Sequence, residues 1–378
     1  MRIVLLAHLR HPIAPPFKGG MEAHSWHLAR GLAARGHRVT LFASGDSDPG
    51  EGVALWPVLP HGYDRDHVPG TPAVNALLDA AHARVAAALL GGGFDVIHNN
   101  GLHRYPPRLA RAHRLPCVTA LHVPPFDALH RAVLDSAAPW SRFTVTSARQ
   151  VASWWDGAPP PQAAVVHNGI DPALWPFSPN GDGSAVWAGR ITPNKGAHLA
   201  VRAAALAGIP LTLFGAVEDQ AYFAARILPF LNGGIRYGGH LAGPDLAGEF
   251  GRASVLMFTP LWDEPFGLAA VEAMCCGLPV AALDMGAARE VIGPAGRFAA
   301  APDARGMANA ARAALSIPRH LARQRVLDHF TIDRMIAGYE RQYDAAIAGL
   351  AQPAPAAAPY PSWDLCAVPA PARAVAAS

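Results

Sequence analysis

The chain has 378 residues, 51% of them apolar, which is enough for two domains of ordinary size with separate cores. Its formal net charge of +3 is small for this length, so nucleic acid is not expected as the main partner, whereas a small anionic ligand is compatible with it. The four cysteines, Cys117, Cys275, Cys276 and Cys366, show no C-x-x-C spacing, which favours reduced thiols in a cytoplasmic protein.

Short apolar segments alternate with loops and helical segments through the first half of the chain. Residues 2–8 (RIVLLAH) predict a buried strand, and after a Pro/Gly loop the pattern predicts a helix from Met21 to Arg35 that Gly36 ends. Further strands are predicted at residues 37–44, 94–100, 117–123, 142–148 and 163–169. This alternation is typical of an open parallel sheet covered by helices.

A proline-rich passage at residues 171–183 separates this half from a second series of the same kind. Strands are predicted there at residues 185–190, 211–216, 235–240, 255–260 and 279–284. We therefore expect an α/β protein with two doubly wound domains, at 1–172 and 173–332, and a closing C-terminal helix at 333–350. Residues 351–378 are rich in alanine and proline and are expected to form a disordered tail.

Two glycines in the first domain mark a candidate anion site. Open α/β sheets bind ligands at the carboxyl ends of their strands, so two facing sheets would hold a site in the cleft between them. Gly19 and Gly20 follow the first strand and precede a helix, where the missing side chains let backbone N–H groups approach an anion. A glycine pair by itself more often marks a plain flexible loop, and that alternative stays open.

The second domain offers cations and acids at its strand ends. The loop AGRITPNKG (residues 188–196) carries Arg190 and Lys195, which could hold a diphosphate from two sides; a solvated basic loop has the same composition. Glu264 precedes a helix predicted from Gly267, and Glu272 projects within the apolar stripe of that helix. A carboxylate there needs a cation or a ligand's hydroxyl groups, so we expect Glu272 to hold a ribose.

The second domain also resembles a known family. The segment EPFGLAAVEAM (residues 264–274) matches the E-x7-E motif of the family-4 retaining glycosyltransferases, and the AGR…K loop, HNGID (167–171) and GLPVAA (277–282) fit the same GT-B pattern in order. The resemblance spans most of the chain and implies a GT-B fold with two Rossmann-like domains. It implies that Arg190 and Lys195 bind the donor diphosphate, that Glu264 acts with them in catalysis, and that the donor is bound by Phe266, Gly267, Leu268, Glu272 and Gly215.

In the first domain the same resemblance points to a histidine. TALHV (residues 119–123) matches a family segment whose histidine lies beside the donor sugar, which implies a catalytic role for His122, although a histidine after an apolar strand can also be a core residue. Gly19 and Gly20 match the phosphate-approaching loop of the family, and Glu290 matches a recurring acid. One departure concerns Gly215, which Ala216, Val217 and Glu218 follow where the family often has a second glycine.

The implied reaction is transfer of a hexose from a nucleotide-diphosphate sugar, UDP-glucose in preference to GDP-mannose, to an acceptor sugar, lipid or small molecule with retention at the anomeric carbon. No cofactor or metal is expected if Arg190 and Lys195 neutralise the leaving group. Asp46 and Asp48 have the D-x-D spacing of a metal-dependent transferase, but a solvated turn explains this stretch better. A non-catalytic nucleotide-sugar-binding protein is the alternative, as is a GT-B phosphorylase or epimerase.

A basic stripe in the first domain is not explained by the donor. If residues 106–114 (PPRLARAHR) are helical, Arg104, Arg108, Arg111 and Arg114 follow one face. Such a stripe could bind a phosphate-bearing acceptor or give a cytoplasmic protein a peripheral contact with the inner membrane face. A solvated helix face is the more frequent explanation of such a pattern.

Overall fold

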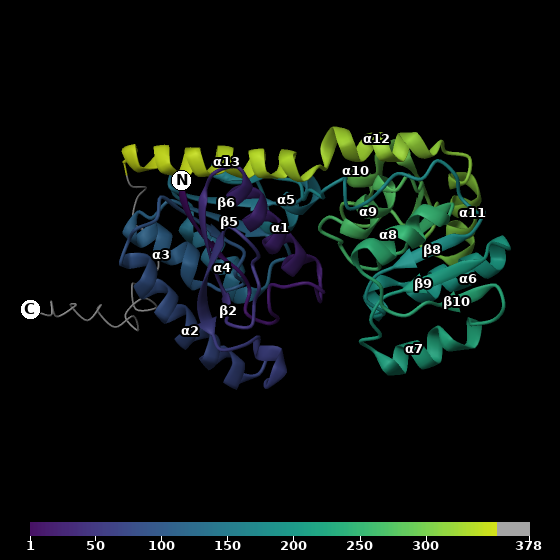
Figure 1. Cartoon of the computed structure of the whole chain (residues 1–378), viewed down its shortest axis with the longest axis horizontal. Helices are drawn as coiled ribbons and strands as arrows, with labels where there is room; N and C mark the ends of the chain where they lie inside the picture. Colours follow the sequence, from purple (N-terminus) through teal and green to yellow (C-terminus); the bar gives the residue numbers. More distant parts are fainter. Residues whose placement is uncertain (354–378) are drawn as a thin grey trace, which may run out of the picture. The chain divides into compact units, whose positions relative to one another are not determined.

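The computed structural model describes residues 1–353, which form two compact units, each with a parallel sheet between helices (Figure 1). The first unit comprises Met1–Val145, Val151–Val166 and the chain from Ile336 onward. The second comprises Thr146–Gln150 and His167–Met335. Compared with the predicted domain ranges, residues 146–150 and 167–172 lie in the second unit, and most of the C-terminal helix lies in the first. The predicted tail falls, from residue 354, outside the described residues.

The first unit contains a seven-stranded sheet in the order β3-β2-β1-β4-β5-β6-β7, and every neighbouring pair is parallel. Its strands are β1 (Arg2–Leu6), β2 (Arg38–Ser44), β3 (Val53–Leu59), β4 (Val96–Asn99), β5 (Cys117–Leu121), β6 (Ser141–Val145) and β7 (Ala163–Val165). The strand order reverses direction between β1 and β4. In open parallel sheets, ligands commonly bind beside the loops that leave the strands on either side of such a reversal.

Strand β3 was not predicted from the sequence, because Pro57 interrupts its apolar run. Proline cannot donate a hydrogen bond to a ladder, so strands that contain it lie at sheet edges. The structure agrees with this rule: β3 is the edge strand and pairs only with β2, with a register shift at Ala43 and Ser44.

The helices of the first unit are α1 (Gly20–Ala34), α2 (Pro72–Leu90), α3 (Tyr105–His113), α4 (Asp127–Ser136), α5 (Ala148–Trp154), whose first residues belong to the second unit, and most of α13 (Ile332–Ala348). By length and composition alone α2 could cross a membrane, a property that a core helix shares. Its residues Ala81, Val85 and Leu89 are buried in one apolar cluster with Val4 of β1 and Ile97 of β4. The helix therefore contributes directly to the core of this sheet.

The second unit contains a six-stranded parallel sheet in the order β10-β9-β8-β11-β12-β13. Its strands are β8 (Ala185–Ala188), β9 (Leu211–Phe214), β10 (Ile235–Tyr237), β11 (Val255–Phe258), β12 (Val280–Ala282) and β13 (Gly296–Phe298). Its helices are α6 (Ala197–Ala207), α7 (Gln220–Arg226), α8 (Gly243–Arg252), α9 (Leu268–Cys275), α10 (Ala288–Ile292), α11 (Ala304–Ala314) and α12 (Arg319–His329). Here the strand order reverses between β8 and β11, so the loops that follow these two strands are the expected place for a ligand.

The last helix, α13, lies along the first unit (Figure 1). Its Tyr339 and Tyr343 are fully buried there, and the hydroxyl of Tyr343 lies 2.9 Å from His98 Nδ1 of β4. On the outer side of the helix, Glu340 pairs with Arg35 at 2.8 Å. The helix predicted at residues 333–350 corresponds to α13, and its buried face contributes side chains to the core of the first unit.

Candidate functional site

The ends of β8 and β9 approach each other closely through two glycines. Gly189 and Gly215 have φ values of 158° and 145°, and a Cβ atom on Gly215 would lie 1.8 Å from the carbonyl oxygen of Gly189. No residue with a side chain fits this contact. Beyond it, Ile191 and Val217 continue as an isolated parallel bridge, which aligns the two loops that leave the strands. Gly215 is therefore explained by packing between loops, and its predicted donor contact stays a prediction.

This alignment places Arg190 against an acid that the sequence analysis did not include in the site. Arg190 Nη1 lies 3.0 Å from Glu218 Oε2, and both side chains are close to half exposed. Glu218 stands in the stretch where the sequence departs from the family pattern after Gly215. This departure from the family pattern was the one sign in the sequence that Glu218 belongs near Arg190. Arg190 is therefore paired with Glu218, and a diphosphate would have to replace that partner.

A buried threonine holds the loop that carries Lys195. Thr259, at the end of β11, donates from its hydroxyl toward the carbonyl oxygens of Lys195 at 3.1 Å and Gly196 at 3.0 Å, and accepts from Trp187 Nε1 at 3.0 Å. Gly196 has φ 70°, and a Cβ atom there would lie 2.0 Å from the carbonyl oxygen of Thr259. The backbone of this loop therefore rests directly on the neighbouring strand end, which fixes where the lysine side chain starts.

Lys195 and Glu264 form the most tightly connected pair among the predicted residues. Lys195 Nζ donates to Glu264 Oε2 at 2.6 Å, and Trp262 Nε1 donates to the same oxygen, also at 2.6 Å. The lysine ammonium also lies 5.0 Å from the centre of the Trp262 ring. Glu264 is 8% exposed, so its charge is largely desolvated and depends on these donors. Both donors reach one oxygen, so Oε1 keeps its capacity to accept.

Glu272, on α9, has a carboxylate without a protein partner. Within residues 1–353, no hydrogen bond or ion pair reaches it, and burial raises its pKa from 4.5 to about 7. Its helix is held at the far end by Arg323 of α12, which donates to the carbonyl oxygen of Cys275 at 2.8 Å. Val271 beside it is fully buried, whereas the Glu272 side chain is partly exposed, so the expected position of this acid toward the apolar side of its helix is met only in part.

The residues at the start of α9 differ in what they can offer a ligand. The ring of Phe266 is 3% exposed and packs in the apolar core, 5.5 Å from the ring of Phe330, and the predicted donor contact of this residue stays a prediction. Gly267 adopts φ 91°, where a Cβ atom would lie 2.7 Å from the Phe258 ring. The N–H groups of Gly267 and Leu268 have no acceptor among the described residues. They therefore present hydrogen-bond donors and a positive helix end to a ligand.

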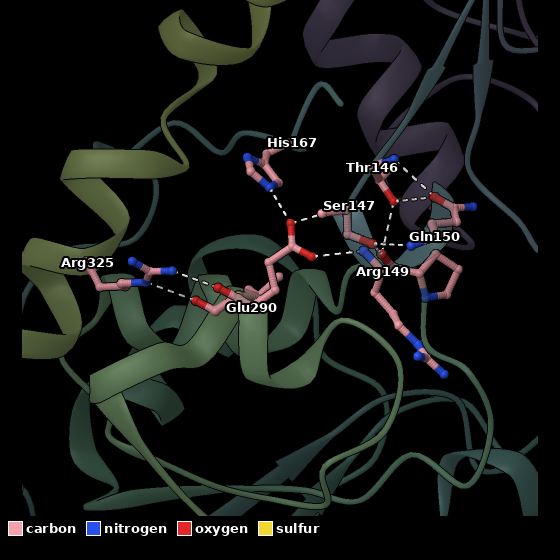
Figure 2. Close-up of polar contacts among 10 residues, drawn as sticks. Thr146, Ser147, Arg149, Gln150, His167, Glu290 and Arg325 are labelled. Carbon is pink, nitrogen blue, oxygen red and sulfur yellow. Dashed lines mark hydrogen bonds and ion pairs between the residues drawn. The ribbon is translucent and has the colours of Figure 1, made fainter. Parts of the chain in front are cut away.

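Glu290, on α10, joins two segments of the second unit that are far apart in sequence (Figure 2). Its carboxylate accepts from the backbone N–H groups of Ala148 at 2.9 Å and Arg149 at 3.1 Å, and from His167 Nε2 at 2.8 Å. Burial opposes the charge of Glu290, but the hydrogen bonds from His167 and the two amides prevail and lower its pKa. Donors from the protein itself already satisfy the Glu290 carboxylate, so its role in this structure is to hold these segments together.

The same short segment supports the E-x7-E loop. Thr146 Oγ1 and Ser147 Oγ both donate to the carbonyl oxygen of Pro265, at 3.1 Å and 2.8 Å (Figure 2). Both side chains are buried. Sequence analysis missed them because they follow strand β6 of the other sheet. Nothing in the local pattern connects that strand end with residue 265.

In the first unit, His122 follows β5 and belongs to a cluster of histidines. Its Nε2 lies 3.1 Å from Asn100 Oδ1, and its ring centre is 4.2 Å from that of His24 on α1. Burial, with smaller contributions from His98 and His8, lowers its pKa to about 3. His122 is thus a neutral imidazole at the carboxyl edge of the sheet, as expected from its position in the sequence. Asn100 was not predicted.

A carboxylate of the protein lies next to Gly19 and Gly20. Glu22, in the first turn of α1, is 4% exposed, and its Oε1 lies 3.1 Å from His8 Nε2. Burial opposes its ionisation, yet the hydrogen bond from His8 and its own backbone N–H lower the pKa of Glu22 below the usual value. A carboxylate at this helix N-terminus disfavours a phosphate there. The predicted phosphate approach at Gly19 and Gly20 is therefore not supported by the electrostatics of this helix end.

The four arginines of the predicted stripe all have intramolecular partners in the first unit, so the stripe is not available as one basic surface. Arg104 pairs with Asp79 at 2.8 Å, and Arg108 pairs with Asp135 at 3.2 Å. Arg111 donates to the carbonyl oxygen of Ala137. Arg114 donates to the carbonyl oxygen of Leu350 at 2.6 Å and lies over the Trp140 ring. These contacts join helices and loops of the unit, and no membrane contact is inferred from them.

The D-x-D stretch has the turn structure that was preferred for it. Asp46 accepts from the backbone N–H of Gly62 at 3.1 Å, and Asp48 accepts from that of Gly50 at 3.0 Å. Across the described part of the chain, no group of three or more His, Cys, Asp or Glu side chains is placed to hold a metal ion. The two aspartates therefore stabilise loops.

Comparison with known sequences gives matches in both halves of the chain. The family Glycosyltransferase Family 4 matches residues 18–174, and the family Glycosyl transferases group 1 matches residues 177–326. A glycogen synthase of Mycobacterium tuberculosis is 28% identical over 411 residues, covering 94% of this chain and 97% of that protein. A D-inositol 3-phosphate glycosyltransferase of Mycobacterium bovis is 29% identical over 335 residues, covering 75% of this chain and 69% of that protein.

Solved structures share the fold. A sucrose-phosphate synthase of Thermosynechococcus elongatus has a TM-score of 0.74 at 20% identity, covering 92% of this chain and 100% of that chain. An Anabaena protein in complex with UDP and glucose has a TM-score of 0.69 at 19% identity, covering 91% of this chain and 99% of that chain. Since the two family matches together span most of the chain and the fold agrees, this protein belongs to the family-4 glycosyltransferases of GT-B fold.

Proposed function

We propose that the protein transfers a hexose from a nucleotide-diphosphate sugar to an acceptor with retention at the anomeric carbon. The observation that carries this proposal is the different state of the two E-x7-E acids in the second unit. Glu264 is paired with Lys195 and keeps one oxygen open, whereas Glu272 is a desolvated carboxylate that no described residue meets. A buried acid without a partner costs stability, and a ligand that donates hydrogen bonds would recover that cost.

The leaving diphosphate would be held by fixed positive groups. Lys195 Nζ uses one of its three protons on Glu264, so two remain for phosphate oxygens. Arg190 is exposed enough to exchange Glu218 for a phosphate. The unpaired N–H groups of Gly267 and Leu268 add the positive end of α9. These groups would stabilise the charge that develops on the leaving group without a metal ion.

The sugar and the ribose would be recognised by carboxylates that accept from hydroxyl groups. Glu264 Oε1 is free to accept from a hydroxyl of the hexose, since its protein donors both use Oε2. Glu272 would accept from the two ribose hydroxyl groups, which favour the charged form and so lower its pKa on binding. In the first unit, the neutral imidazole of His122 would hydrogen-bond a hydroxyl of a sugar substrate.

UDP-glucose is the first donor to test, ahead of GDP-mannose. Structures of the Anabaena protein of the same fold are described in complex with UDP and with UDP-glucose, which supports this order. The acceptor is a sugar, a lipid or a small molecule. Localisation in the cytoplasm, where nucleotide sugars are available, is part of the proposal.

The experiment measures binding first and turnover second. UDP, GDP and ADP are compared by thermal shift, and calorimetry then follows the best nucleotide in two buffers of different ionisation enthalpy near pH 7. Binding should release protons from the wild type, because Glu272 ionises, but not from Glu272→Gln. Donor hydrolysis is then followed with a chelator present. Arg190→Ala and Lys195→Ala should lower kcat more than they raise KM, whereas Arg305→Ala on the exposed face of α11 serves as the control.

Each alternative has its own outcome. Binding without hydrolysis or transfer would favour a non-catalytic nucleotide-sugar-binding protein. Phosphorolysis without a nucleotide would identify a sugar phosphorylase, and interconversion of nucleotide sugars would identify an epimerase. Strict dependence on a divalent cation would contradict the role given to Arg190 and Lys195. If none of the three nucleotides stabilises the protein, the donor site itself is wrong.

A further inference from the structure

In the first unit, one amide oxygen faces two imidazoles at neighbouring strand ends. Asn100 Oδ1 lies 2.8 Å from His98 Nε2 and 3.1 Å from His122 Nε2. The amide nitrogen of the same residue donates to Ser25 Oγ of α1 at 3.0 Å. Its backbone N–H donates to the carbonyl oxygen of Leu6 at 2.8 Å, which anchors it at the switch between β1 and β4. Asn100 is fully buried and held at both ends.

This orientation determines where the histidine protons are. An amide oxygen can only accept, so both Nε2 atoms that face it must carry a hydrogen. His98 then has a lone pair on Nδ1, and the hydroxyl of Tyr343 from α13 lies 2.9 Å from that atom as a donor. The hydrogen bonds from Tyr343 to His98 and from His98 to Asn100 are therefore consistent with each other, because each donated proton has one acceptor.

His122 is left with an unused lone pair. Its Nδ1 has no hydrogen-bond partner among the described residues, and the side chain is only partly buried. Three titratable groups surround it: His24, whose tilted ring has its centre 4.2 Å away, His98, and His8, which pairs with Glu22 at 3.1 Å. Burial lowers the pKa of His24 well below its usual value and that of His98 to about 4, so neither adds a positive charge beside His122 near neutral pH.

We propose that Asn100 is a positioning residue that holds His122 in the Nε2–H tautomer, so that Nδ1 presents a hydrogen-bond acceptor to the ligand. This inference rests on the proposed function, in which His122 meets a hydroxyl of a sugar substrate. A neutral imidazole held in this way can accept at Nδ1 but cannot donate there. The ligand group at this point must therefore be a donor, such as a sugar hydroxyl. A phosphate or carboxylate oxygen would meet a lone pair and is disfavoured.

The tautomer can be measured in the wild-type protein without any variant. Ring nitrogens labelled with ¹⁵N report by their shifts which nitrogen carries hydrogen, and the signals of His122 are assigned by their loss in His122→Gln. We expect the Nε2–H form throughout the range from about pH 6 to about pH 8. The Nδ1–H form or an imidazolium in that range would overturn the proposal. The Nδ1–H form would mean that the Asn100 amide is turned with its nitrogen toward the histidines.

Two substitutions then test what the tautomer does. Asn100→Asp places a carboxylate between two imidazoles and should raise the pKa of His122, so kcat should fall on the acid side and recover toward alkaline pH. Asn100→Ala removes the orienting group and should lower kcat by about tenfold or more, with the affinity for the bare nucleoside diphosphate unchanged. Asn75→Asp, on the exposed face of α2, is the matched control and should behave like the wild type.

The outcomes separate this inference from the function on which it rests. An Asn100→Asp pH profile that superimposes on the wild-type profile would overturn the positioning role, even if the enzyme is active. The expected tautomer together with no turnover of any nucleotide sugar would refute the proposed function, while the assignment of the His122 proton to Nε2 would be supported. If Asn100→Ala does not fold, the wild-type spectrum and the Asn100→Asp profile still decide the question.

Discussion

Replacing Glu272 by glutamine should stabilise the protein above neutral pH and change little in acid. The folded structure raises the pKa of this carboxyl group from 4.5 to about 7, because burial disfavours its charge and no described residue compensates it. Below pH 4.5 both the folded and the unfolded chain carry the protonated form, so the group contributes nothing to the pH dependence of stability. Its effect is confined to higher pH.

The sign and size of the change in unfolding free energy follow from the difference in the pKa of Glu272 between the folded and unfolded chain. Between pH 4.5 and about 7 the unfolded chain has lost this proton while the folded chain keeps it, so stability falls as the pH rises. The fall is complete above the folded pKa. At about 1.4 kcal/mol for each tenfold change in the ionisation constant, the full penalty is about 3 kcal/mol, and partial exposure of the side chain reduces it to about 1 to 3 kcal/mol. Glu272→Gln removes this penalty because an amide does not ionise.

Urea unfolding of wild type and Glu272→Gln at a series of pH values measures the difference directly. The variant should gain about 1 to 3 kcal/mol over the wild type on going from about pH 4.5 to about pH 8. Glu51→Gln changes an exposed acid and should show no such trend. A difference between Glu272→Gln and wild type that does not vary with pH, or a loss of stability at alkaline pH, would refute the statement that the carboxylate is desolvated and unpaired.

Three further outcomes are expected. Thr259→Val should cost about 1 to 3 kcal/mol of unfolding free energy, measured by urea, because Trp187 Nε1 and two carbonyl groups lose their buried partner; an unchanged midpoint would contradict this. Gly215→Ala should lower the Tm by the equivalent of about 2 kcal/mol or more, since its Cβ would meet the Gly189 carbonyl oxygen. Glu218→Gln should lower the KM for the donor at constant Tm, because Arg190 loses a competing anion; a raised KM would assign Glu218 to the ligand instead.

Most strands were predicted because their signal is local. Apolar runs such as residues 117–123 and 255–260 are buried on both faces of a parallel sheet, so they stand out in the sequence. The two strands that were missed carry a weaker signal. β3 contains Pro57 and lies at an edge, and β13 is the three-residue segment Gly296–Phe298, which is too short to show a period.

Partners of charged groups were not predictable in the same way. Arg114 was expected on an exposed stripe, but it reaches the carbonyl oxygen of Leu350, and Glu290 reaches the amide of Ala148. These contacts join segments that only the fold brings together. Neither helical period nor composition contains that information, because a long charged side chain has the same pattern whether it is solvated or paired.

The sequence by itself determined the α/β class and the position of Arg190, Lys195 and Glu264 in loops that follow strands, because these follow from periodicity and from the direction of the chain in a parallel sheet. Only the tertiary structure decided which acidic side chains are paired with other residues of the protein. Glu264 is paired with Lys195 and Glu22 with His8, whereas Glu272 meets no described residue. The physical reason is that the state of a buried charge depends on donors within a few ångströms, and folding brings those donors from distant parts of the chain.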